Sequence, residues 1–233
     1  MSATVTDLHL LSLMQLCDSN FPTGAFSHSF GLETYIQEDR VSSKQTFYEW
    51  LQAYVNEQLV YTDGLASRLT YEALEQNQVE TVWNLDRLMT VQNFPRESRE
   101  GSRRMGEGML RLGSELYESP QVRAYRERVK AKQSSGHPAI VFALLAHHLE
   151  IPKKTAVLSY LYSTTAALIQ NGVRAIPLGQ TEGQRLQCEM QPLLLQAVEL
   201  IEQLDPDDLG IVTPGLELAQ MRHEQLNIRI FSS

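Results

Sequence analysis

Cysteine is scarce in this sequence, and its beginning does not have the form of a secretory signal. Only Cys17 and Cys188 occur among 233 residues. Two cysteines so far apart do not make a disulfide framework or a Cys-x-x-Cys zinc site. The first residues also lack the basic stretch and apolar run of an exported precursor. We therefore expect a cytoplasmic protein without structural disulfides.

Basic residues are outnumbered by acidic ones. The chain has 20 lysines and arginines against 28 aspartates and glutamates, which gives a formal net charge of −8. A protein that binds nucleic acid needs a basic face to neutralise phosphates. Nucleic acid is therefore not an expected partner, and the acidic balance favours a soluble protein.

A long, purely apolar run is also absent. Residues 155–173 carry no charge, but polar side chains such as Ser159, Thr164 and Asn171 occur along the whole stretch. Such groups are costly in lipid, so we expect no membrane span. The pattern instead predicts the central helix of a bundle, covered on all sides.

The common catalytic motifs are missing. The sequence contains no Gly-x-Ser-x-Gly, no phosphate-binding Gly-x(4)-Gly-Lys-Ser/Thr loop and no His-Glu-x-x-His, and its six histidines have no ligand spacing. We expect no metal, no cofactor and no enzymatic activity. Asp18, Ser27 and His28 contain the residue types of a catalytic triad, although residues adjacent in sequence rarely point at each other. A helical hydrolase that uses His28 as its general base is the alternative function.

Apolar residues recur mostly at helical spacing. The pattern predicts a first helix over 8–17 and a helix through Leu59 that starts at a capping box of Ser42 and Gln45. Further helices are expected over 65–77, 79–89, 139–148 and 186–204. The fold class that follows is all-α: a single-domain helical bundle of about ten helices over residues 1–209. A flexible or partner-ordered tail over residues 210–233 is expected to bind partners.

Residues 18–33 form the stretch around which the chain is organised. Pro22 and Gly24 favour a turn after the first helix, and Ser27 is a plausible N-cap for a second helix with His28 in its first turn. Phe21 and Phe26 lie on this turn. Two aromatic residues on a short polar loop either plug the core or present a recognition surface, and both interpretations stay open.

The segment 96–116 mixes charges of both signs at i, i+4 spacing, which is typical of a solvated helix face. Gly106 and Gly108 are unusual there, because each glycine inside a helix costs up to about 1 kcal/mol relative to alanine. Close approach of another helix or of a partner would explain them. The basic residues of 121–132 are expected to be ordinary surface.

The end of the chain is apolar without an evident cover. Ile228, Ile230 and Phe231 lie within the last six residues. Exposed apolar residues at a terminus are unusual unless something packs on them.

Several blocks of sequence resemble the UreF family of urease accessory proteins. They are Leu10–Leu32 (LLSLMQLCDSNFPTGAFSHSFGL), Gln170–Gln184 (QNGVRAIPLGQTEGQ) and Met221–Ser233 (MRHEQLNIRIFSS), with a weaker block over Arg96–Arg111. Together they span nearly the full length in the order of the family. This match is more specific than any single short motif.

The resemblance implies a fold and a role. Family members are all-helical homodimers that act in nickel insertion into urease without enzymatic activity of their own. They bridge the UreD-type (also called UreH-type) accessory protein and the GTPase UreG, and the assembly hands nickel to the urease apoprotein. In the family, the C-terminal tail becomes ordered on binding UreD, and the aromatic loop supports the same surface that recruits UreG.

The resemblance also places residues. Phe26 occupies the aromatic position ahead of the Ser-His-Ser-x-Gly-Leu-Glu motif at 27–33, and Arg229 matches the arginine of the closing motif. Ile228 and Ile230 depart from the serine and leucine that are frequent there. Arg99, Arg103 and Arg229 are candidates to contact an acidic GTPase surface, and an arginine finger is an open hypothesis. The expected partner-binding residues are Phe21, Phe26, Ser27, His28, Arg99, Arg103, Arg222, His223, Arg229 and Phe231.

Overall fold

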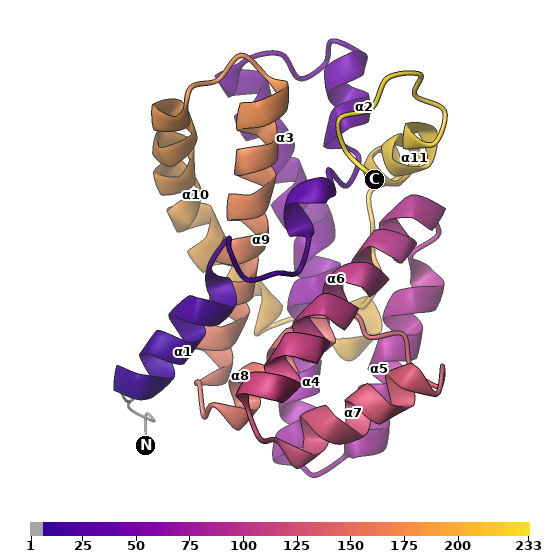
Figure 1. Ribbon diagram of the computed structural model, residues 1–233. Coiled ribbons are helices and arrows are strands. Elements are labelled where there is room, and N and C mark those ends of the chain that lie inside the picture. The colour runs from indigo at the N-terminus through magenta and orange to yellow at the C-terminus, as the bar shows by residue number, and fades with distance from the viewer. Residues whose placement is uncertain (1–6) are drawn as a thin grey trace.

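The computed structural model describes residues 7–233, and every regular element in that range is a helix (Figure 1). The expected all-α fold is therefore confirmed for the described range. Residues 1–6, the start of the expected domain 1–209, lie outside it. The elements are α1 (Asp7–Cys17), η1 (Ala25–Ser27), α2 (Leu32–Gln37), α3 (Lys44–Tyr54), η2 (Val55–Gly64), α4 (Leu65–Glu75), α5 (Val79–Gln92), α6 (Arg96–Leu116), α7 (Pro120–Lys130), α8 (Pro138–His148), α9 (Lys153–Ala175), α10 (Gln180–Ile201), η3 (Pro206–Asp208) and α11 (Pro214–His223).

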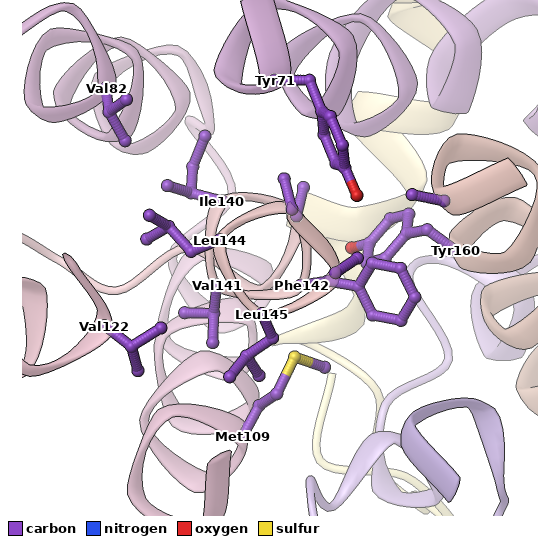
Figure 2. Packing of buried hydrophobic residues seen from close by; sticks show 14 of the residues in the cluster. Tyr71, Val82, Met109, Val122, Ile140, Val141, Phe142, Leu144, Leu145 and Tyr160 are labelled. Atoms are coloured by element: carbon purple, nitrogen blue, oxygen red, sulfur yellow. The ribbon is translucent and has the colours of Figure 1, made fainter. Parts of the chain in front are cut away.

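Two hydrophobic clusters hold the bundle together. One surrounds α8, in which every residue from Pro138 to Ala146 is buried. Figure 2 shows α8 side chains such as Val141 and Leu145 directed toward Met109 of α6 and the surrounding helices. The second cluster joins α3, α9 and α10. Helix α9 contributes to both clusters, so the two cores form one domain.

The prediction that residues 155–173 form the central helix, covered on all sides, is wrong. The uncharged stretch 155–173 lies within α9, but Tyr162 on this helix is 40% exposed. Several other side chains of α9, such as those of Ser159 and Ser163, are only partly buried, so this helix is not covered on all sides. The helix enclosed on all sides is α8, whose continuous apolar sequence suits that position.

The capping box of α3 is one residue later than predicted. The side chains of Ser43 and Thr46, rather than Ser42 and Gln45, make the reciprocal bonds. Thr46 is preferred because its hydroxyl accepts from the backbone N–H of both Ser42 (3.0 Å) and Ser43 (3.1 Å). The helix then continues without a break through the π-helical η2 into α4.

Close contacts within the subunit explain the glycines of α6. A Cβ atom on Gly106 would lie 1.6 Å from the carbonyl oxygen of Gly136, and one on Gly108 would lie 3.0 Å from that of Pro22. The turn before α8 and the loop after α1 therefore pack directly on the backbone of α6. No outside partner is needed to explain these glycines.

The loop after α1 contains two left-handed glycines. Gly24 has φ of 81° and Gly31 has φ of 91°. Between them lies the short η1, and α2 begins only at Leu32. The expected N-cap at Ser27 is therefore wrong, because Ser27 ends η1 and the positive φ of Gly31 separates it from α2. Residues 7–233 include no helix with both the length and the apolar character needed to cross a bilayer.

Candidate partner-binding site

The two aromatic residues of the loop have opposite environments. Phe21 is 7% exposed and belongs to the cluster around α8, whereas Phe26 is 62% exposed. The core-plug interpretation therefore fits Phe21, and Phe26 has the exposure that a recognition residue needs.

Side chains of α9 hold the backbone of this loop. Arg174 donates to the carbonyl oxygen of Phe26 at 2.8 Å, and Asn171 donates to that of His28 at 2.8 Å. The loop also rests on α6 at Gly108. These contacts fix the loop from two helices, so Phe26 projects from a supported backbone rather than from a free one.

The last residues of the chain lie on the same loop. The backbone N–H of Ser232 donates to Ser27 at 2.7 Å, and that of Ser29 donates to Ser233 at 2.5 Å. The Ser233 hydroxyl contacts Nδ1 of His28 at 2.8 Å. Figure 1 shows the C-terminus beside the segment that precedes α2. Loop and tail therefore form one continuous surface.

A buried ionic cluster ties the tail to α2 and α6. His223, at the end of α11, lies between two carboxylates: its Nε2 is 2.9 Å from Glu33 and its Nδ1 is 2.6 Å from Glu97. Arg229 donates to the other oxygen of Glu97 at 2.7 Å. Glu33 also accepts from the backbone N–H of Ile230 at 2.5 Å and of Phe231 at 3.1 Å.

The cluster has a defined charge arrangement. Both ring nitrogens of His223 face carboxylate oxygens, and both can donate only when the ring is an imidazolium. Burial raises the pKa of Glu97, but hydrogen bonds from His223 and Arg229 outweigh burial and bring the pKa below its ordinary value. Burial lowers the pKa of His28, and electrostatic interaction with Arg104 and His223 lowers it further.

The last residues of the tail differ in burial. Phe231 is buried, and the guanidinium of Arg174 lies 5.1 Å from the centre of its ring. Ile228 is 77% exposed and Ile230 is 54% exposed. This subunit therefore leaves Phe26 of the loop, and Ile228 and Ile230 among the last six residues, without cover.

The remaining predicted residues lie at the edge of this site or apart from it. Ser27 is half-buried and contributes its carbonyl oxygen, and Arg222 lies 3.4 Å from Glu38. Arg103 pairs with Glu107 on α6. Arg99 donates to two carbonyl oxygens, those of Asn93 and Phe94, and so caps the turn after α5.

Sequence reasoning missed Glu33, Glu97 and Arg174. Glu33 is the last residue of the Ser-His-Ser-x-Gly-Leu-Glu motif at 27–33, but a glutamate in the first turn of a helix is expected because it interacts favourably with the helix dipole. Glu97 lies in a segment of mixed charge, and Arg174 is a single charge after the uncharged stretch 155–173. A surface position is the ordinary expectation for both. Only the fold brings these three side chains, from α2, α6 and α9, to one tail.

Among residues 7–233, no group of three or more histidine, cysteine, aspartate or glutamate side chains could hold a metal ion. The cluster at His223 does not qualify because its two carboxylates bind opposite nitrogens of the ring. They therefore do not converge on one point with the imidazole, as ligands of one metal would.

A cavity of about 70 Å³ is lined by residues of both hydrophobic clusters, among them Tyr54 and Tyr160. Asp63, Tyr160 and Gln92 are among the residues that line it, and Tyr160 donates to Asp63 at 2.7 Å. A cavity of this size holds water or a small ligand, whereas a protein partner contacts the outer surface.

Comparison with known proteins assigns the family. The UreF family model matches residues 41–191. A urease accessory protein UreF from Lachnoclostridium phytofermentans is 57% identical over 227 residues, which cover 97% of this chain and 100% of the relative. The chain belongs to the UreF family. A urease accessory protein UreF from a Bacillus species, strain TB-90, is 53% identical over 96% of this chain and 99% of the relative.

The similarity to these UreF proteins reaches the loop and the tail. The family model begins after α2 and ends within α10, so it covers neither region. The alignment with the Lachnoclostridium protein leaves only about 3% of the chain uncovered, which is too little to omit the whole loop or the whole of residues 210–233. The resemblance to the UreF family drawn from the sequence is confirmed.

Proposed function

We propose that this UreF-family chain is a urease accessory protein that acts in nickel insertion into the urease active site. In this role it performs no bond-making chemistry. It is an adaptor that bridges the UreD/UreH-type accessory protein and the GTPase UreG for delivery to the urease apoprotein. The observation that carries the proposal is the joined surface of loop and tail, with exposed apolar residues on a supported backbone.

The chemistry of this surface suits binding of the UreD-type protein. Aromatic and aliphatic side chains that lose water on contact supply most of the free energy at interfaces, and arginines are enriched beside them. Phe26, Ile228 and Ile230 are the exposed anchors, and Arg229 is partly exposed between the two isoleucines. The buried residues Phe21, His28, His223 and Phe231 support this surface from beneath.

Nickel content of urease tests the role in cells. We expect urease produced without this chain to contain little nickel, and wild-type chain to restore the metal. Phe26→Ala should restore much less at an equal protein level. Full nickel loading of urease in cells that lack the chain would refute the proposal.

Arg99, Arg103 and Arg229 are the candidate contacts with UreG. Arg99 and Arg229 already bond to partners within the subunit, and Arg103 pairs with Glu107 on an exposed helix face, where such pairs are weak. Arg103 is therefore the residue most available to an acidic GTPase surface. If it acts as an arginine finger, the complex should hydrolyse GTP about 10³–10⁵-fold faster than UreG alone. Unchanged GTP turnover in the complete complex would leave a scaffolding role.

A homodimer is the proposed oligomeric state. The resemblance to the family supports it, and light scattering of the purified chain would measure it. A mass near twice 26.4 kDa is expected. A mass of one subunit at micromolar concentration would overturn this part of the proposal.

Geometry disfavours the alternative of a hydrolase with His28 as its base. His28 is buried, one ring nitrogen is engaged by Ser233, and the ring packs against the backbone of Gly101. A general base must come within hydrogen-bond reach of a substrate proton. The contacts of His28 therefore favour a structural role.

A further inference from the structure

The end of α5 and the turn after it carry three exposed apolar side chains. Leu88 and Val91 lie three positions apart, on one side of the helix, and Phe94 follows in the turn before α6. Their exposed fractions rise in that order, from 36% through 57% to 66%. Exposed apolar side chains that gather within seven residues are typical of a surface that contacts another protein.

The turn that carries Phe94 is held in place. Arg99 donates through Nη1 to the carbonyl oxygens of Asn93 at 2.8 Å and of Phe94 at 3.0 Å. Just before the turn, the side chain of Gln92 donates to the carbonyl oxygen of Leu209 at 3.2 Å. The backbone beneath the exposed ring is therefore supported, so little conformational entropy is lost when a partner covers that ring.

A hollow of about 150 Å³ opens beside this turn. The residues that line it include Met89 of α5, Asn93 of the turn, Arg99 and Arg103 of α6, and His137. An apolar cavity of about this size takes up a ring as large as benzene. Each arginine contributes an aliphatic stem as well as a guanidinium. The hollow therefore suits one apolar side chain with negative charge beside it.

The surroundings of these apolar residues are basic, although the chain as a whole has a net charge of −8. Arg87, one helical turn before Val91, is exposed and has no ion pair or hydrogen bond within residues 7–233. Both bonds of Arg99 use Nη1, so its Nε and Nη2 have no partner in the same range, and no carboxylate neutralises its charge.

The carboxylates of the neighbouring face of α6 are already paired. Glu107 binds Arg103 at 2.8 Å, and Glu100, which also lines the hollow, lies 3.5 Å from Arg104. Each of these exposed pairs has no net charge. The charge that remains is that of the two arginines described above, so this surface attracts carboxylates on a partner.

A second copy of this chain does not suit this surface. A dimer with two-fold symmetry places the same patch on both sides of its interface. Arg87 and Arg99 of one subunit would then face the same arginines of the other, and like charges across an interface cost free energy. A partner with an acidic surface avoids this repulsion.

We propose that Leu88, Val91 and Phe94, with the adjacent hollow, form a docking surface for an acidic protein partner. That partner inserts an apolar side chain into the hollow and places carboxylates against Arg87 and Arg99. No residue of the tail over 210–233 lines the hollow. The identification of the partner as UreG, for which an acidic surface is expected, rests on the proposed function.

Titration of UreG into the purified complex of this chain with the UreD-type protein tests the inference. Phe94→Ala should weaken binding of UreG by at least about 10-fold, as loss of an interface anchor does. Arg87→Glu should weaken it by about 10-fold or more at low salt, because a carboxylate then faces the carboxylates of the partner. The affinity of the wild-type complex should fall as salt is added, and that of Arg87→Glu should fall less.

The controls separate this effect from general damage. Phe94 and Arg87 are both exposed, so their variants should unfold in urea close to the wild-type midpoint and bind the UreD-type protein with unchanged affinity. Arg123→Glu makes the same change of charge on α7, which does not line the hollow. Arg123 is exposed and has no ion pair or hydrogen bond within residues 7–233. Its variant should bind UreG as the wild type does.

Equal affinity of UreG for the wild-type, Phe94→Ala and Arg87→Glu complexes would overturn the inference and leave the adaptor role intact. Equal weakening by Arg123→Glu would overturn it too, because the effect would then be one of total charge. A monomeric mass of either variant beside a dimeric wild type would show that a second copy occupies the surface, against the inference. Failure of UreG to bind even the wild-type complex would refute the proposed function, and with it the identification of the partner.

Discussion

Two phenylalanines five positions apart separate stability from recognition. Phe21 fills the core around α8, and Phe26 projects from a loop held by Arg174. Removing a buried phenyl ring costs transfer free energy and leaves a cavity, whereas removing an exposed ring costs little. The two roles can therefore be measured independently.

Phe21→Ala should lower the free energy of unfolding by about 3–5 kcal/mol. Phe26→Ala should change it by less than about 0.5 kcal/mol but weaken binding of the UreD-type protein by at least about 10-fold, as expected for an interface anchor. Urea unfolding and a titration of the partner provide the two measurements. Equal destabilisation by both substitutions would contradict this division of roles.

The ionic cluster also makes a prediction about acid. Because the pKa of Glu97 in the folded chain lies below its ordinary value of 4.5, its ionised form stabilises the fold above that pH. The contribution is lost as the pH falls below 4.5 and passes the lowered value. Wild type should therefore lose more stability than Glu97→Gln over that interval. If the unfolding midpoints of wild type and Glu97→Gln fell by the same amount down to strongly acid pH, the ionised Glu97 carboxylate would contribute nothing to stability.

At the scale of elements, the glycine content of α6 follows from the two segments that pack on its backbone. Gly106 and Gly108 allow the turn before α8 and the loop after α1 to lie close to the helix backbone. This close packing costs helix propensity, because glycine is a poor helix former. This packing positions the loop that carries Phe26, because Gly108 contacts the carbonyl oxygen of Pro22.

Gly106→Ala should destabilise the chain by several kcal/mol, because the new Cβ would lie 1.6 Å from the carbonyl oxygen of Gly136 and the backbone must move. Gly179→Ala is the control. Nothing lies within 4 Å of its Cβ position, so a change within about 0.5 kcal/mol is expected. Thermal unfolding compares them, and a similar melting temperature for both variants would contradict the packing explanation.

Helix positions were predictable from the sequence where the apolar spacing agrees with residues that begin or end helices, such as proline. Pro138 marks the start of α8, and the helix predicted from Val79 begins where expected. The helix predicted from Leu65 is instead the continuation of α3 and η2. Two finer predictions were wrong because of local interactions. Thr46, rather than Gln45, is the capping partner in α3. The positive φ of Gly31 moves the start of α2 to Leu32. The cluster of Glu33, Glu97 and His223 was not predictable, because no local pattern specifies contacts between residues 190 and 126 positions apart.

At the scale of the whole molecule, two cores share α9, and the tail closes over the face where α2, α6 and the loop meet (Figure 1). Although residues 210–233 include α11, their last six residues use backbone hydrogen bonds and ionic pairs more than apolar burial. Such a segment is removable without opening either core.

Deletion of residues 226–233 should abolish binding of the UreD-type protein and leave dimerisation intact. This truncation spares His223, which a deletion of Met221–Ser233 would remove together with the last turn of α11. Size-exclusion chromatography with and without the partner is the measurement. Co-elution of the truncated chain with the partner would count against the tail as a binding element.

The adaptor role is tested most directly by mixing purified UreD-type protein and UreG with and without this chain and measuring the mass of each complex. We predict that UreG joins the UreD-type protein in one complex only when the wild-type chain is present. The Phe26→Ala variant should fail to join them. A stable complex of UreG with the UreD-type protein that forms equally well without this chain would contradict the account.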